Sequence, residues 1–478
     1  MKKRVFLTGA TGTMGREAML RMTEHPADIE LTVLKRRGGK RHRKNHSLVE
    51  ELERQGKLRV IYGDLRNYED VRRGVEDADY VLHVGGMVSP AADHCPELTR
   101  EVNVGSAMNI VRAVKSRGDG GRGVKVVYIG SVAQLGNRSQ PLHWGRSGDP
   151  VWTAEFDVYG QSKVEAERVI AESGIPCWVS LRQTGILAKD IVAKGADPIT
   201  FHVPVRGVLE WVSAEDSGNL LCNLVLADLP ENFWKRFYNI GGGKGFRLSN
   251  YEFEKLILKA MSCPPMEKIF DADWFATRNF HGLWYEDSDE LEEWLHFRTV
   301  KDAATYFERF RKSLPWYFRL TKLVPAFMIK AGMSYLSRRK PLGTMSWPGR
   351  DEARMRAFFG GEDKWRAVPD WEHTDLSHPL ETPVRLDHGY DESKPESELD
   401  IEDLQSAARF RGGRCLAQNM TPGDLDTPVE WECHDGHRFM MTPRLVLLGG
   451  HWCPECFGPD ADYEKEAALN PFFAQVYS

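Results

Sequence analysis

The chain has 478 residues, 64 of them basic and 69 acidic, and this length exceeds one ordinary hydrophobic core. We therefore expect a large domain with one or two smaller units. The net charge of -5 excludes a general attraction to nucleic acid or to an anionic membrane. MKKR leads directly into a short apolar run without a secretory leader pattern, and no apolar run approaches the roughly 20 residues of a membrane span. We expect a cytoplasmic protein without a transmembrane segment.

Apolar runs of strand length alternate with amphipathic stretches through the first part of the chain. The strand candidates begin at Val5, Ile29, Leu58, Asp79, Val124 and Cys177. Residues 97–115 and 158–172, which lie between them, read as helices. Continuous apolar strands separated by helices indicate a parallel sheet that is covered on both faces. The sequence therefore predicts an α/β fold with a doubly wound parallel sheet.

The first strand candidate ends in TGATGTMG, in which Gly9, Gly12 and Gly15 recur at intervals of three. A glycine turn between a strand and a helix presents backbone N–H groups and the positive helix terminus, where a pyrophosphate binds. Such turns also occur in folds that bind no nucleotide. The context of alternating strands and helices favours the nucleotide site.

The end of the second strand carries seven Lys or Arg side chains and no acid within residues 35–44. An acid at this place binds the ribose of NAD, whereas a basic residue binds the 2′-phosphate of NADP. We therefore expect NADP(H) rather than NAD(H), with Arg36 and Arg37 as phosphate ligands because a guanidinium can bind phosphate through two hydrogen bonds. The alternatives are a solvated basic loop or a nucleic-acid patch.

The C-terminal third changes character. Residues 301–340 read as helical, aromatic and basic, and 314–340 predict either a helix pair packed on the main domain or a lid or membrane-surface helix that admits a lipophilic substrate. Residues 341–404 are rich in proline and charge without a sustained period, which predicts a loop-like linker. A cysteine-rich unit at 405–460 and a tail at 461–478 follow.

Four cysteines crowd the end of the chain, whereas Cys95, Cys177, Cys222 and Cys263 are scattered and are expected to be buried free thiols. Cys433 and His437 form a C-x3-H knuckle, and Cys453 and Cys456 form a C-x2-C knuckle. Two such knuckles can close a tetrahedral site suited to a structural Zn²⁺. This stretch resembles the small zinc-ribbon domains with a WxCxxGHxW…WCPxC pattern. Cys415 is an outside candidate ligand, and His434 and His451 are expected to be exposed neighbours.

Seven motifs in order resemble the extended short-chain dehydrogenase/reductases, the NAD-dependent epimerase/dehydratase family. They are TGATGTMG from Thr8, GDL from Gly63, HVGG from His83, NVGS from Asn103, YIGSVA from Tyr128, YGQSK from Tyr159 and YNIGGG from Tyr238. The resemblance covers roughly residues 3–300. It implies a Rossmann-type domain over 1–300 with a smaller substrate-binding part at about 182–300.

The resemblance also assigns residues to the cofactor. The dinucleotide loop would be formed by Gly9, Thr11, Gly12, Thr13, Met14 and Gly15. Asp64 and Leu65 match the pair beside the adenine, and Gly85 lies in a turn next to the cofactor. Asn103 matches a residue that is often structural.

The same resemblance implies a catalytic set of Ser131, Tyr159 and Lys163. Tyr159 and Lys163 are four residues apart, which places them on one helix face. A phenol has a reference pKa of about 10, and a nearby ammonium and an oxidised nicotinamide lower it. Tyr159 would exchange a proton with the substrate oxygen, Ser131 would donate a hydrogen bond to that oxygen, and Lys163 would also bind the nicotinamide ribose.

Ser131 is followed by Val132, Ala133 and Gln134, whereas sugar-nucleotide dehydratases carry acids there. The sequence therefore favours an NADP(H)-dependent oxidoreductase that transfers hydride to or from a secondary alcohol or ketone of a bulky or lipophilic small molecule, of which a steroid-like compound is one example. The alternatives are a sugar-nucleotide epimerase with bound NAD and a non-enzymatic NADP-binding regulator. We further expect a homodimer and leave open a protein or nucleic-acid contact through the zinc-ribbon-like unit.

Overall fold

The computed structural model describes all residues except 1, 38–42, 190, 192–196 and 478. Its centre is a seven-stranded sheet in the order β3-β2-β1-β4-β5-β7-β11, and every neighbouring pair is parallel. The strands are β1 (Lys3–Thr8), β2 (Ile29–Lys35), β3 (Arg59–Tyr62), β4 (Tyr80–His83), β5 (Lys125–Ser131), β7 (Cys177–Gln183) and β11 (Arg236–Ile240). The strand order reverses between β1 and β4, and ligands of such sheets bind at that point, beyond the carboxyl ends of the strands.

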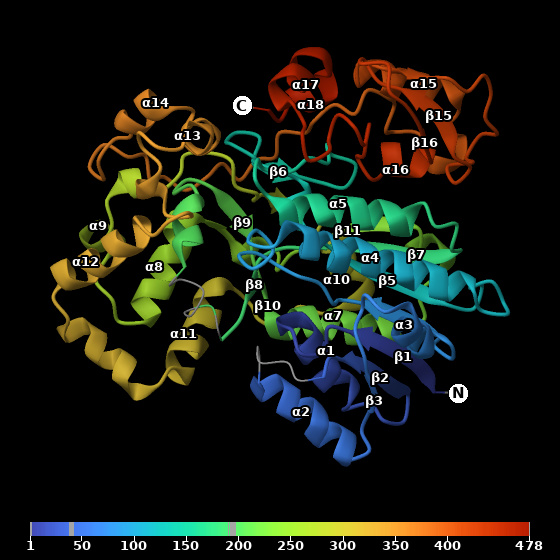
Figure 1. Cartoon of the computed structure of the whole chain (residues 1–478), viewed down its shortest axis with the longest axis horizontal. Helices are drawn as coiled ribbons and strands as arrows, with labels where there is room; N and C mark the ends of the chain where they lie inside the picture. Colours follow the sequence, from blue (N-terminus) through green and yellow to red (C-terminus); the bar gives the residue numbers. More distant parts are fainter. Residues whose placement is uncertain (1, 38–42, 190, 192–196, 478) are drawn as a thin grey trace.

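Helices cover both faces of the sheet (Figure 1). One core joins the sheet to α1 (Thr13–Met22), α2 (Arg43–Arg54), α7 (Ala214–Leu226) and α10 (Asp289–Leu295). The other joins it to α3 (Tyr68–Val75), α4 (Pro96–Lys115) and α5 (Val158–Ala171). The prediction of a doubly wound parallel sheet is confirmed. Its strands are apolar throughout because both faces are buried.

Beyond the sheet the chain builds a second lobe with its own aromatic core, which contains Phe201, Phe253 and Phe275. This core also takes in Phe307 and Phe310, so it extends past the expected end at residue 300. The lobe's elements are β8 (Ile186–Leu187), η2 (Pro198–His202), β9 (Val208–Glu210), β10 (Val212–Ser213), η4 (Lys244–Phe246), β12 (Arg247–Ser249), α8 (Asn250–Ala260), α9 (Met266–Ile269), η5 (Ala272–Trp274), β13 (Trp284–Tyr285), α11 (Ala303–Ser313), η6 (Trp316–Leu323) and α12 (Ala326–Ser337). Within the described ranges, no helix is both long and apolar enough to cross a membrane.

Residues 341–404 are mostly irregular, as a loop-like segment would be, but they include short helices. These are η7 (Thr344–Ser346), α13 (Glu352–Phe359), α14 (Glu362–Arg366) and η8 (Glu396–Glu398). Asp351 caps α13, and Phe358 and Phe359 pack with Trp347. A helix of two turns has too few residues to show a periodic pattern, so α13 could not be predicted from the sequence.

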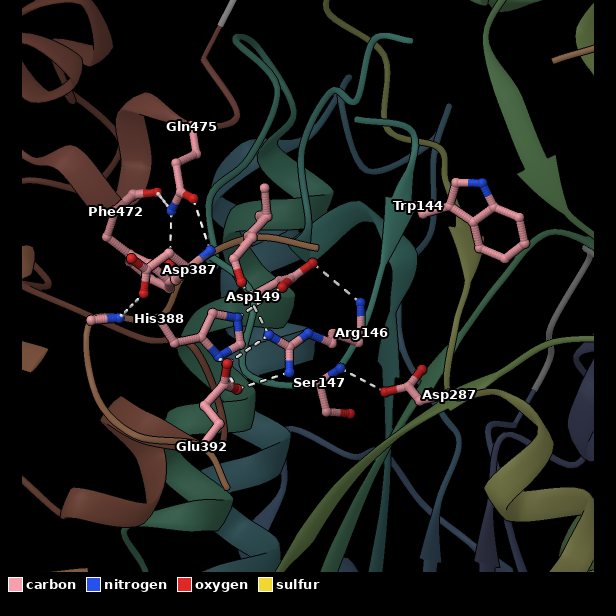
Figure 2. Close-up of polar contacts among 12 residues, drawn as sticks. Trp144, Arg146, Ser147, Asp149, Asp287, Asp387, His388, Glu392, Phe472 and Gln475 are labelled. Carbon is pink, nitrogen blue, oxygen red and sulfur yellow. Dashed lines mark hydrogen bonds and ion pairs between the residues drawn. The ribbon is translucent and has the colours of Figure 1, made fainter. Parts of the chain in front are cut away.

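The same segment is fastened to the sheet domain by a buried polar network (Figure 2). His388 is fully buried, and its Nε2 lies 3.0 Å from Asp149 Oδ1. Arg146 donates to both carboxylate oxygens of Glu392 at 2.8 Å. Asp149 also pairs with Arg138 at 3.0 Å. The segment is therefore held against the turn that follows the two-residue strand β6 (Trp144–Gly145).

The last 78 residues form a small module above α5 in Figure 1. Its three-stranded antiparallel sheet has the order β14-β15-β16. Trp431 and Leu445 share one core with Trp178, Phe237 and Ala166 of the sheet domain. The elements are α15 (Ile401–Phe410), β14 (Arg414–Cys415), β15 (Val429–Glu432), β16 (Arg438–Met441), α16 (Pro443–Leu447), α17 (Tyr463–Leu469) and α18 (Pro471–Ala474).

Candidate functional site

The glycine turn after β1 permits backbone approaches that no side chain would allow. Gly9 has φ of +77°, in the left-handed region, and a Cβ on it would lie 2.7 Å from Gly85 N. A Cβ on Gly15 would lie 2.3 Å from Gly9 O. The turn therefore presses the start of α1 against β1 and the end of β4. Gly12 caps α1 without a side chain, so its first N–H groups point to the place where a pyrophosphate would bind.

The other residues predicted for this loop differ in what they can offer. Thr11 and Thr13 are half-buried, and Thr11 O accepts a hydrogen bond from Asn45 Nδ2 at 2.9 Å. Met14 is only 5% exposed and packs into the core beneath α1. Met14 can therefore meet a cofactor through its backbone alone.

Leu65, one of the two residues predicted beside the adenine, lies close to Gly85 at the end of β4. A Cβ on Gly85 would lie 2.8 Å from Leu65 Cδ1. Burial alone would raise the pKa of Asp64, but hydrogen bonds from Arg66 and the nearby charge of Arg36 hold that pKa below its ordinary value. The Arg36 guanidinium thus lies close enough to Asp64 to contribute to the lowering of its pKa.

The basic stretch after β2 places two exposed guanidinium groups directly beyond the end of the strand. Arg36 and Arg37 are exposed, and the Arg37 guanidinium lies 5.9 Å from the Tyr62 ring centroid. Lys35 is not available, because its side chain is buried and paired with Glu50. Lys40 and Arg41 lie outside the described residues.

The structure brings Ser131, Tyr159 and Lys163 together at the carboxyl end of β5. The Ser131 hydroxyl lies close enough to the Tyr159 phenol to influence the pKa of that phenol. Lys163 Nζ lies 6.0 Å from the Tyr159 ring centroid and donates to Ile129 O at 2.7 Å. Gln134 Oε1 accepts from Ser131 N at 2.7 Å, which fixes the backbone of the serine. Two elements, β5 and α5, therefore supply the whole set.

The charges of this set differ from the expectation that Lys163 lowers the pKa of the phenol. Burial raises the pKa of Tyr159 to about 12, and the nearby Ser131 hydroxyl offsets part of that rise. Burial lowers the pKa of Lys163 to about 8, against the charge of Glu167. The Lys163 ammonium donates to the backbone carbonyl of Ile129. A bound oxidised nicotinamide would add the positive charge that favours the phenolate.

Asn103 braces the site, as a structural residue would. Its Oδ1 accepts from Met87 N at 2.7 Å, and its Nδ2 donates to Met87 O at 3.0 Å. Nδ2 also donates to Ser162 Oγ at 2.8 Å. The side chain ties α4 to α5 and to the loop after β4, so it positions the helix that carries Tyr159.

Two carboxylates beside the start of α5 escaped the sequence analysis. Asp157 caps α5 by accepting from Gly160 N at 2.7 Å, and its Oδ2 lies 3.3 Å from His281 Nδ1. Burial and the charge of Asp157 raise the pKa of Asp93 to about 6. These three residues are 64 and 124 positions apart along the chain, so no local motif could have joined them.

The predicted zinc ligands converge. His437 Nδ1 lies 3.4 Å from Cys433 Sγ and 3.6 Å from both Cys453 Sγ and Cys456 Sγ. Cys456 Sγ lies 3.6 Å from Cys433 Sγ. A tetrahedral zinc with Zn–S near 2.3 Å and Zn–N near 2.0 Å separates its ligand atoms by about 3.5–3.8 Å. The donor set therefore fits Zn²⁺, and Cys415 lies outside the cluster.

His451 and His434 are not the exposed neighbours that the sequence suggested. His451 is 3% exposed, and its Nε2 lies 2.8 Å from Glu167 Oε1. His434 Nε2 lies 2.7 Å from Glu466 Oε2. The two partners, Glu167 and Glu466, come from distant elements, so the spacing of residues around the knuckles could not predict these contacts.

Comparison with known proteins agrees with this geometry. Residues 5–174 match the family described as NAD dependent epimerase/dehydratase family, which confirms the resemblance over this part of the chain. A UDP-glucose 4-epimerase from Rickettsia bellii (strain OSU 85-389) is 27% identical over 112 residues, which are 23% of this chain and 32% of that protein. The chain spans between 32% and 39% of the length of the curated relatives it matches.

Two solved structures share the fold. A dTDP-glucose 4,6-dehydratase from Streptomyces venezuelae, a double mutant with NAD bound, superposes with a TM-score of 0.50 at 18% identity over 66% of this chain and 96% of that one. A UDP-glucuronic acid 4-epimerase from Bacillus cereus, in complex with UDP-glucuronic acid and NAD, gives 0.51 at 14% identity over 67% and 100%. At these identities the likeness establishes the fold alone.

Proposed function

We propose that this protein is a nicotinamide-dependent enzyme that oxidises or reduces a carbon bearing a hydroxyl or carbonyl group. The observation that carries the proposal is the convergence of Ser131, Tyr159 and Lys163, with Lys163 Nζ 6.0 Å from the Tyr159 ring centroid. This trio lies at the carboxyl edge of the same sheet whose first turn fits a pyrophosphate. A purely regulatory nucleotide-binding protein would not need the trio.

The bound nicotinamide supplies the acceptor or donor of the hydride. Ser131 and Tyr159 would bind the substrate oxygen from one side, and the Tyr159 hydroxyl would give or take its proton. Lys163 would hold the nicotinamide ribose and keep positive charge near the phenol. Asn103 keeps α5 at the correct distance from the loop after β4.

NADP(H) is the cofactor that the described cations favour. Arg36 and Arg37 are exposed directly after β2, and β2 ends in Lys35 rather than in an acid. Two solved neighbours hold NAD. Binding of NADPH and NADH, each titrated by the change in protein fluorescence, decides between the two, and tighter NADH would refute the NADP(H) assignment.

A sugar-nucleotide epimerase is the second candidate, and the comparisons favour it over a steroid-like oxidoreductase. The family matched by residues 5–174 and the similar epimerases carry this preference. The acid pair expected of a dehydratase is missing after Ser131, although Asp93 and Asp157 bring two carboxylates near α5 from elsewhere. We retain transfer to a lipophilic alcohol as the alternative.

One experiment separates these activities. The purified full-length protein is denatured, the released nucleotide is identified, and the native protein is incubated with a panel of nucleotide sugars and lipophilic alcohols. An epimerase carries its cofactor through purification and interconverts sugars without a net change in nicotinamide absorbance. An alcohol oxidoreductase changes that absorbance with added cofactor. If neither occurs and no nicotinamide nucleotide binds, the proposed function fails.

The metal cluster is a structural site in this proposal. Cys433, His437, Cys453 and Cys456 would hold Zn²⁺ through four protein ligands, which leaves no open position for a substrate. The metal would stabilise a module too small to keep its fold by apolar burial alone.

A further inference from the structure

The second lobe exposes a concentrated apolar surface, which we call the apolar ridge. Eight of the 17 exposed large hydrophobic side chains in the described part of the chain lie within residues 316–335. The ridge consists of Trp316, Tyr317, Leu320, Leu323, Val324, Phe327, Met328 and Tyr335. Trp316, Leu323, Phe327 and Tyr335 are each more than 70% exposed. An apolar patch of this kind marks an interaction site rather than ordinary surface.

The part of the ridge on α12 is held in place by the opposite side of that helix. Ile329, Met333 and Leu336 of α12 pack against the aromatic core of the lobe. Lys330 pairs with Asp271, and α12 contacts α9 and η2. The inward side chains of α12 thus pack on the core of the lobe, whereas its outward side chains are apolar although they are exposed. A helix that is apolar on both sides is expected to be covered on both sides.

The charge around the ridge is of one sign. Residues 309–350 contain ten Lys or Arg and no Asp or Glu, although the whole chain has a net charge of -5. Arg319, Lys322 and Arg339 are exposed, and none of them has an acidic partner among the described residues. Aromatic and aliphatic side chains rimmed by cations match the apolar interface and anionic headgroups of a bilayer surface.

We propose that the apolar ridge docks the protein on the surface of an anionic lipid bilayer, with η6 and α12 lying in the plane of the interface. The charge favours this occupant over a second copy of the chain, because a two-fold interface through the ridge would bring two unpaired sets of cations together. The proposal is independent of the catalytic assignment, since no residue of the ridge belongs to the Ser131 and Tyr159 site.

The test is co-flotation of the full-length protein with vesicles of phosphatidylcholine containing one third phosphatidylserine, compared with phosphatidylcholine alone. Binding is measured in about 0.1 M and about 1 M salt, between which the screening length falls from ~10 Å to ~3 Å. We expect binding to the anionic vesicles at low salt, at least about tenfold weaker binding at high salt, and similarly weak binding to neutral vesicles.

Two variants of the ridge are each paired with a control variant at exposed positions elsewhere in the chain. The triple variant Trp316→Ser, Leu323→Ser, Phe327→Ser is compared with Met108→Ser, Met440→Ser, which alters exposed apolar side chains elsewhere. The charge variant Arg319→Glu, Lys322→Glu is compared with Lys57→Glu, Arg122→Glu. Each ridge variant is expected to lose at least about tenfold in vesicle affinity, while its control binds as the wild type.

Three outcomes would overturn the proposal. The first is no binding of wild type to anionic vesicles, and the second is unchanged binding of the triple variant. The third is a wild-type dimer that the triple variant dissociates, measured by sedimentation velocity without lipid, because the ridge would then be a contact between copies. All ridge substitutions are at exposed positions, and an unchanged thermal midpoint confirms that each variant is folded.

Discussion

Glu167 of α5 and His451 of the C-terminal module meet in a buried hydrogen bond of 2.8 Å between Oε1 and Nε2. Arg182 of β7 donates to the same carboxylate at 2.7 Å and to Gly449 O at 2.7 Å. Glu167 lies one helical turn after Lys163, and His451 lies two residues before the metal-ligand candidate Cys453. The module is therefore linked directly to the helix that carries the predicted catalytic pair.

Glu167→Gln should shift the pH dependence of activity. Burial lowers the pKa of Lys163 to about 8 and the charge of Glu167 opposes this, so loss of that charge lowers the pKa further. The ammonium form of Lys163 predominates below this pKa. The alkaline limb of the pH–rate profile should therefore move to lower pH. His451→Gln, which keeps the carboxylate charge, should leave this limb in place, and an unmoved limb in Glu167→Gln would remove Lys163 from the mechanism.

Tyr159→Phe should abolish nearly all turnover and leave cofactor affinity within a few fold, because it deletes only the proton donor. Single-turnover absorbance of the nicotinamide measures the first effect, and fluorescence titration measures the second. Removal of general acid–base catalysis typically costs about 10²–10⁴ in rate. Near-normal turnover would contradict the role assigned to the phenol.

Replacing Arg36 and Arg37 with alanine should weaken NADPH binding and spare NADH. One charge-assisted contact to phosphate contributes about 1.5–3 kcal/mol, which corresponds to roughly tenfold to a hundredfold in affinity. Arg122→Ala removes an exposed cation elsewhere and serves as the control. Equal losses for both cofactors would show that these cations bind no 2′-phosphate.

Cys456→Ser should lower the zinc content from one ion per chain to well below that, as measured by mass spectrometry. Cys415→Ser is the matched control, because Cys415 lies outside the ligand cluster. The module shares a core with Trp178 and Phe237, so loss of its fold should also lower the thermal midpoint of the sheet domain. A zinc-free variant with normal stability but no hydride transfer would instead place the metal at the active site.

Glu392→Gln should make the protein less stable at neutral pH, with the deficit shrinking in acid. Burial would raise the pKa of Glu392, but His388 and Arg146 outweigh it and lower that pKa from 4.5 to about 2. A lowered carboxyl pKa contributes stability above pH 4.5 that is lost as the pH falls toward 2. Thermal midpoints across this range, with Glu430→Gln as an exposed control, measure the effect, and parallel curves would contradict it.

The sequence predicted what rests on local pattern. Apolar strands spaced by helices gave the doubly wound sheet, and the spacing of Cys433, His437, Cys453 and Cys456 gave a cluster whose ligand atoms do converge. Gly9 and Gly15 were found because a tight turn needs glycine at fixed intervals. The proximity of Ser131 and Tyr159 followed from the family resemblance rather than from either residue alone.

What the sequence missed depends on contacts between distant segments. His451 was expected at the surface, yet Glu167 binds it from 284 positions away. His388 and Asp149 are 239 positions apart, and no pattern around either residue indicated a buried network. The pKa of Tyr159 also depends on burial, which a spacing rule does not contain.

Residues near the C-terminal end of the described chain pack beside the start of α5. Because they are synthesised last among the described residues, this contact forms late during synthesis. Tyr463 and Phe473 stack edge-on against Trp152, and the Tyr463 hydroxyl contacts Thr153, 310 positions earlier. While the ribosome is still making the module, Trp152 has no cover. The sheet can form on the nascent chain, but the surface next to α5 is completed only once residues 463–473 have been synthesised, so this region is the one that a chaperone would need to protect.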